Sequence, residues 1–124
     1  MAVRVTIFDD NKRLLDSLSV LIDGSPGFQM AGIFENCNNL ISDIERTQPD
    51  VILMDIVMPE TNGFQATRKI TKDPDTAHIP VIIVSTKSQT TDRMWGMRQG
   101  ASEYLTKPVV EAELIAAVNK VLSK

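Results

Sequence analysis

Residues 51–55 read VILMD, four apolar side chains in a row followed by a carboxylate. A continuous apolar run of this length is typical of a strand buried on both faces, as at the centre of a parallel sheet. Pro49 and Asp50 break the chain just before it. Residues 79–84 form a second such run, IPVIIV, with Pro80 near its start, where a missing N–H is tolerated. Two strands of this kind predict a parallel sheet with helices on both faces.

Strand-like and helical segments alternate over the rest of the chain. Further strands are expected at 3–8, 28–34 and 103–106. Apolar residues recur at helical spacing after Asn11 and Asn39 and in three later segments, which are 64–70, 89–99 and 111–122. Residues 58–63 contain a proline and an Asn-Gly pair and are expected to form a loop. The alternation predicts five βα units and a doubly wound α/β sheet.

Composition limits the protein class. A chain of 124 residues has the length of one domain. Its net charge of −3 argues against non-specific nucleic-acid binding, which usually needs a basic face. No apolar run approaches the roughly 18–20 residues that span a bilayer. The single cysteine, Cys37, suits a reducing compartment. We therefore expect a cytoplasmic protein that binds neither membranes nor nucleic acid directly.

Polar side chains follow four of the five predicted strands. Asp9 and Asp10 come after the first, Asp55 after the third, Ser85 at the end of the fourth and Lys107 after the fifth. In open α/β sheets ligands bind beyond the carboxyl ends of the strands. These five side chains are therefore expected to converge on one site.

The residue types suit phosphoryl transfer. Three carboxylates placed together are costly unless a cation lies among them, and oxygen ligands of this kind suit Mg²⁺. Asp55 follows the central strand and is the best-placed nucleophile for attack on phosphorus. Lys107 can supply positive charge to the phosphoryl oxygens, and the Ser85 hydroxyl can donate a hydrogen bond to them.

Each of these residues also has an ordinary structural interpretation. An acidic pair after a strand is commonly a helix cap, and a lysine is commonly solvated. The site hypothesis depends on their coincidence at four strand ends. An aspartyl-phosphate phosphatase is a rival, but such enzymes use a spaced acidic pair with the nucleophile on the first strand, and this chain has no room for a cap domain. A nucleotide-binding module is disfavoured because no glycine-rich loop follows the first strand.

The chain resembles the receiver domains of bacterial response regulators (CheY-like) over residues 1–124. The matching motifs are FDD at 8–10, ILMDIVMP at 52–59, NG at 62–63, VIIVST at 81–86 and QGASEYLTKP at 99–108. The resemblance implies a flavodoxin-like (βα)5 fold, a five-stranded parallel sheet in the order 2-1-3-4-5. It also implies a two-component signalling role in which a histidine kinase donates a phosphoryl group.

The resemblance assigns roles to particular positions. Asp55 would be the phosphoacceptor and, with Asp10, a direct Mg²⁺ ligand. Val57 would offer its backbone carbonyl to the metal, and Asp9 would act through a metal-bound water. Lys107 would pair with the phosphoryl group, and the Lys107–Pro108 bond would be cis.

The resemblance also implies a switch. Ser85 would move toward the phosphoryl group and Tyr104 would move inward. This movement would reshape an output face made of helix 89–99, strand 103–106 and helix 111–122, to which a downstream protein binds. The protein would be a monomer or weak dimer, and not an enzyme beyond accepting the phosphoryl group and losing it slowly. A phosphorylation-independent adaptor is the alternative.

Some features leave alternatives open. Residues from about 50 onward look like single-domain regulators of type IV pilus twitching motility. Residues 5–24 look more like receivers attached to helix-turn-helix transcription factors, so both one natural lineage and an engineered chimera are considered.

Val57 leaves no polar side chain to orient water, which predicts slow self-dephosphorylation. Trp95 is expected in the core with its neighbours Met94 and Met97, with a partner-facing position as the alternative.

Overall fold

The computed structural model describes residues 2–58 and 60–123. None of the helices in these two stretches is long and apolar enough to cross a membrane. The elements follow in the order β1 (Val3–Phe8), α1 (Lys12–Asp23), β2 (Phe28–Phe34), α2 (Leu40–Thr47), β3 (Val51–Met54), β4 (Val57–Met58), β5 (Thr61–Asn62), α3 (Gly63–Lys72), β6 (Val81–Ser85), α4 (Thr90–Arg98), β7 (Glu103–Thr106) and α5 (Glu111–Leu122).

Five strands form one parallel sheet in the order β2-β1-β3-β6-β7. This order is the predicted 2-1-3-4-5, because β4 and β5 lie outside the main sheet. The predicted α/β fold is therefore confirmed. All four side chains of β3 are at most 1% exposed, as expected for a strand covered on both faces. Full burial of one such side chain contributes about 1.5–3 kcal/mol.

The expected loop at 58–63 is wrong in part. Residues 57–62 contain a short antiparallel hairpin in which Val57 pairs with Asn62 and Met58 with Thr61. Asn62 is also the N-cap of α3, since its side chain accepts a hydrogen bond of 2.9 Å from the Gln65 N–H. Strands of two residues have no hydrophobic period, so the turn residues dominated the sequence pattern.

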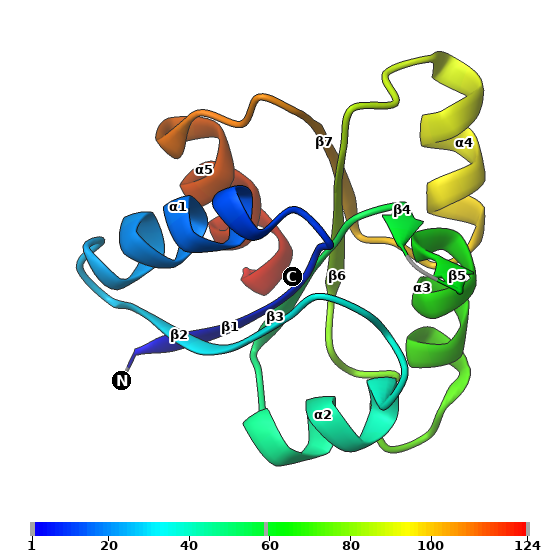
Figure 1. Cartoon of the computed structure of the whole chain (residues 1–124), viewed down its shortest axis with the longest axis horizontal. Coiled ribbons are helices and arrows are strands. Elements are labelled where there is room, and N and C mark those ends of the chain that lie inside the picture. The colour runs from blue at the N-terminus through cyan, green and yellow to red at the C-terminus, as the bar shows by residue number, and fades with distance from the viewer. Residues whose placement is uncertain (1, 59, 124) are drawn as a thin grey trace.

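Helices cover both faces of the sheet (Figure 1). On one face α1 and α5 enclose a core with the inward side chains of β1, β3 and β6, such as Ile7, Leu53 and Ile82. On the other face α2 and α3 pack against Phe8, Ile52 and neighbouring side chains. Because side chains alternate along a strand, residues 52 and 53 belong to opposite cores. The two cores hold the strand ends in fixed relative positions.

The core position expected for Trp95 is wrong. Trp95 is 50% exposed and Met94 52% exposed. Of the described α4 residues only Gly96 is buried, and a Cβ added there would lie 2.9 Å from Ile83 Cδ1. α4 therefore packs on the sheet through a glycine, and its large apolar side chains face outward.

Candidate functional site

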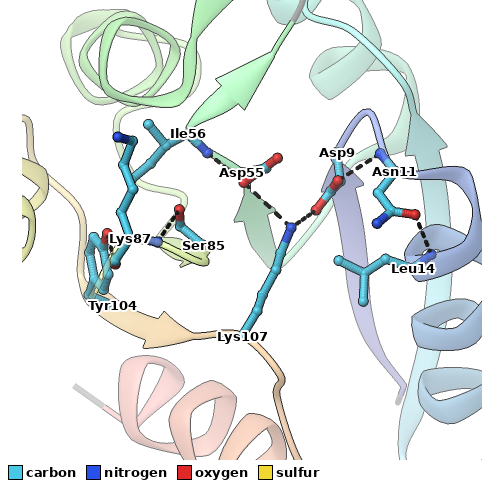
Figure 2. A network of polar contacts seen from close by, with 9 residues as sticks. All are labelled: Asp9, Asn11, Leu14, Asp55, Ile56, Ser85, Lys87, Tyr104 and Lys107. Atoms are coloured by element: carbon cyan, nitrogen blue, oxygen red, sulfur yellow. Dashed lines mark hydrogen bonds and ion pairs between the residues drawn. The ribbon is translucent and has the colours of Figure 1, made fainter.

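The five polar side chains predicted at the strand ends lie at one edge of the sheet. Asp9 follows β1, Asp55 follows β3, Ser85 ends β6 and Lys107 follows β7. Figure 2 shows the Lys107 ammonium between the carboxylates of Asp9 and Asp55. The parallel sheet brings these side chains together, because β1 and β6 flank β3 and β7 flanks β6.

Asp9 is buried and has two partners. Its Oδ2 atom lies 2.8 Å from the Lys107 Nζ, and its Oδ1 accepts a hydrogen bond of 2.9 Å from the Asn11 N–H. Asn11 in turn caps α1, since its side chain accepts from the Leu14 N–H at 3.2 Å. Asp9 is therefore fixed from two sides, by the start of α1 and by the residue after β7.

Asp55 is also buried, with its side chain only 8% exposed. Its Oδ1 accepts a hydrogen bond of 2.9 Å from the Ile56 N–H and lies 3.5 Å from the Lys107 Nζ. Burial first and the Asp9 carboxylate second raise the pKa of Asp55, and Lys107 opposes them. An ionised Asp55 is thus costly here until more positive charge arrives.

Asp10 completes the acidic group. It is exposed, and one carboxylate oxygen from each of Asp9, Asp10 and Asp55 lies within 4.8 Å of the others. Three carboxylates face one ammonium, so the group keeps a net negative charge. All the donors are hard oxygen atoms, which Mg²⁺ prefers. The residues present therefore fit a magnesium ion.

Ser85 and Tyr104 meet at one residue. The Ser85 Oγ accepts a hydrogen bond of 3.2 Å from the Lys87 N–H, and the Tyr104 hydroxyl donates one of 2.7 Å to the Lys87 carbonyl (Figure 2). The Tyr104 ring is buried, and its pKa is raised, chiefly by that burial. Tyr104 thus occupies the inward position in this structure.

Gly63 allows the hairpin to approach the site. A Cβ at this position would clash with the Asp55 carbonyl oxygen, and the Gly63 N–H donates a hydrogen bond of 2.7 Å to the Ile56 carbonyl. Glycine is therefore required here by close backbone contact. The start of α3 supports the backbone on which the Asp55 carboxylate is carried.

Several contacts had no signal in the side-chain pattern. The Ile56 N–H and the Lys87 carbonyl act through the backbone, which every residue type offers. Arg93 places its guanidinium 5.4 Å from the Tyr104 ring centroid, a contact that only the packing of α4 on β7 creates. The Val57 side chain is 58% exposed, and a metal contact of its carbonyl stays a prediction. The Lys107–Pro108 bond is cis, as expected.

Comparisons with known proteins agree with this geometry. The chain is 48% identical over 120 residues to "Protein PilH" of Pseudomonas aeruginosa, and the match covers 97% of this chain and 98% of that protein. It is 35% identical to "Response regulator PleD" of Caulobacter vibrioides, of which it spans 26%. The match to PilH runs through both parts of the chain, so the comparisons give no support to a chimera.

Solved structures and a family model give the same result. The response regulator domain of Thermotoga maritima CheB superposes with a TM-score of 0.88 at 26% identity, over 100% of this chain and 98% of that one. The family model described as "Response regulator receiver domain" matches residues 5–119. The chain therefore belongs to the receiver domain family of two-component response regulators.

Proposed function

We propose that this receiver, comprising residues 1–124, accepts a phosphoryl group on Asp55 from the phosphohistidine of a sensor kinase. One observation carries the proposal: a buried carboxylate and an ammonium lie together with two further carboxylates at the carboxyl ends of the strands. Positioning and charge stabilisation are what phosphoryl transfer demands of a protein.

The transfer step is a substitution at phosphorus. An Asp55 carboxylate oxygen forms the new bond, the bond between phosphorus and the histidine nitrogen breaks, and its electron pair stays on the imidazole, which takes up a proton. Oδ1 already accepts from Ile56 N–H and lies beside Lys107. We therefore assign the attack to Oδ2. Lys107, held 2.8 Å from Asp9, is within reach of the incoming phosphoryl oxygens.

Asp10 and Asp55 would hold Mg²⁺ directly, with the Val57 carbonyl. Asp9 would act through a water, with its Oδ1 held by the Asn11 N–H and its Oδ2 by Lys107. The ion would offset the negative charge of the acidic cluster and of the phosphoryl oxygens.

The signal would leave through Ser85 and Tyr104. The Ser85 hydroxyl can donate to the phosphoryl group, and both side chains bind the backbone of Lys87. A shift of Ser85 would therefore reach Tyr104 through one residue. The output face, to which a downstream protein would bind, would comprise α4, β7 and α5. The protein would be a cytoplasmic monomer or weak dimer that makes no direct contact with nucleic acid. It would have no catalytic turnover beyond slow loss of phosphate.

Intact-protein mass after incubation with acetyl phosphate tests the proposal. We expect one phosphoryl adduct that requires Mg²⁺ and is absent in Asp55→Asn. In Lys107→Ala we expect slower formation of the adduct. A folded protein that binds Mg²⁺ but forms no adduct would contradict the proposal and favour a phosphorylation-independent adaptor.

A further inference from the structure

The outward side of α3 and α4 combines cations with half-exposed apolar side chains, and the proposed phosphorylation site uses none of them. We call this surface the α3–α4 face and define it by Phe64, Arg68, Lys72, Met94, Trp95 and Arg98. An exposed aromatic group with arginines beside it has the composition of a binding hot spot.

The two helices form one surface. The Phe64 and Trp95 rings meet edge to face, with centroids 6.5 Å apart. Near the other ends of the helices, the Thr71 hydroxyl donates a hydrogen bond of 3.0 Å to the Gln99 carbonyl. Arg68 and Lys72 follow Phe64 at intervals of four residues along α3, so they lie on the same side of that helix. The helices thus stay adjacent along the face.

The face is hollowed in two places. A hollow of about 180 Å³ on α4 is lined by Thr91, Met94, Trp95 and Arg98. A broader one on α3, about 660 Å³, includes Arg68 and Lys72. The smaller hollow has the size for one apolar side chain beside Trp95, with Arg98 at its edge.

The cations of the face have no carboxylate partner in the part of the chain that the structure describes. Among the described residues Arg46, Lys107 and Lys120 form ion pairs, whereas Arg68, Lys72 and Arg98 form none. In the described part of the chain Asp73 is the only carboxylate that lines either hollow. The face is therefore locally positive on a chain whose net charge is −3.

We propose that the α3–α4 face docks an acidic segment of a partner protein, with an apolar side chain of that segment against Trp95 and Met94. Carboxylates of the segment would pair with Arg68 and Arg98, since complementary charge sets register and specificity. The hollow beside Trp95, which can take an apolar side chain, favours a protein segment over a nucleic acid or an anionic membrane. With Lys69 of the α3 hollow included, the cations number four, only the lower end of the about four to eight that anionic lipid surfaces usually need. The face shares α4 with the proposed output face. The test below uses the unphosphorylated protein, so a failure of this inference is distinguishable from a failure of the proposed phosphorylation.

Trp95 is the only tryptophan in the sequence and reports directly on the face. The probe is a tryptophan-free helical peptide with one glutamate-rich and one leucine-rich side, added to the unphosphorylated protein. We expect a saturable blue shift of Trp95 emission at micromolar peptide. We expect at least tenfold weaker binding by the double variant R68E/R98E and also by Arg98→Glu alone. Arg13→Glu on α1, across the sheet, changes the charge by the same amount as Arg98→Glu and should leave binding unchanged.

Three results would overturn the inference. One is the absence of a saturable emission change with the acidic peptide. A second is equal binding of a matched peptide with lysine in place of glutamate, or equal binding by R68E/R98E. The third is tighter, Arg68-dependent binding of duplex DNA or phosphatidylserine vesicles, which would reassign the face to nucleic acid or lipid. Circular dichroism of each variant verifies that it is folded.

Discussion

At the scale of single residues, Asp55 has the least favourable environment for a charge. Burial and the Asp9 carboxylate raise the pKa of Asp55 above its ordinary value of 3.8. A carboxyl whose pKa is higher in the folded than in the unfolded protein binds its proton more tightly when folded. Between those two pKa values, the contribution of Asp55 to the free energy of unfolding therefore falls as pH rises. Above the folded-state pKa of Asp55, its buried charge lowers the free energy of unfolding by the full amount.

Replacing the charge should therefore stabilise the metal-free protein. We expect Asp55→Asn to raise the free energy of unfolding at pH 7, because the amide carries no buried charge. Lys107 keeps its contact with Asp9, so no charge is left unpaired. The gain over the parent should vanish below about pH 3, where the Asp55 carboxyl is largely protonated in both states. Urea unfolding in EDTA at several pH values measures this difference. A gain independent of pH, or a loss at pH 7, would contradict the assignment.

Val57 should control the lifetime of the phosphorylated state. Its side chain is 58% exposed two residues after Asp55 and offers no polar atom to a nearby water. We expect Val57→Asn to lose phosphate several-fold faster than the parent, because an amide can orient the attacking water. The measurement is the decay of the phosphoryl adduct after acetyl phosphate is removed. Equal or slower decay in the variant would refute the idea, and Val57→Ala serves as the apolar control.

The site residues that act through their side chains could be predicted from the sequence, whereas the contacts made by backbone groups could not. Asp9, Asp55, Ser85 and Lys107 could be found because a charged or hydroxyl side chain follows each of four apolar strands. The Ile56 N–H hydrogen bond to Asp55 depends on the local backbone path. That path has no residue-type signature, and the same holds for the carbonyl of residue 87, which accepts from Tyr104.

At the scale of elements, the hairpin β4–β5 is the least predictable part of the fold. The five sheet strands were predictable because buried runs and helical periods differ clearly in sequence. Residues 57–62 have neither period. α4 was misjudged for a related reason: helical spacing cannot tell which side faces the sheet when a glycine, Gly96, makes the contact.

The close approach of Gly63 to the Asp55 backbone should make this position intolerant of any side chain. We expect Gly63→Ala to lower the free energy of unfolding by about 1–3 kcal/mol, as overpacking usually does. We also expect weaker Mg²⁺ binding, because relief of the clash moves the Asp55 backbone. Urea unfolding and a Mg²⁺ titration measure the two effects. Gly24→Ala is the control at an exposed helix end with a φ of −81°, where a Cβ would lie 3.0 Å from the Val20 carbonyl oxygen, so it should lose a little stability but keep its Mg²⁺ affinity. Unchanged Mg²⁺ affinity in Gly63→Ala would contradict the argument.

At the scale of the whole molecule, the parallel sheet separates three tasks. Its carboxyl edge gathers the carboxylates and Lys107, and β6 and β7 carry Ser85 and Tyr104. The helices on either face (Figure 1) would present surfaces to the proposed partners. α4 links two of these tasks. A Cβ added at its buried Gly96 would lie 3.1 Å from the Tyr104 ring, and its outer side carries Trp95. Events at the acidic cluster and binding at the surface therefore meet on one helix.

The central claim is that Asp55, rather than Asp9 or Asp10, receives the phosphoryl group. Borohydride reduction of the phosphorylated protein followed by peptide mass mapping tests it most directly, because reduction converts an aspartyl phosphate to homoserine. We predict homoserine at position 55 alone, formed only after incubation with both acetyl phosphate and Mg²⁺. Homoserine at position 9 or 10, or at no position in a protein that carries the adduct, would contradict the account.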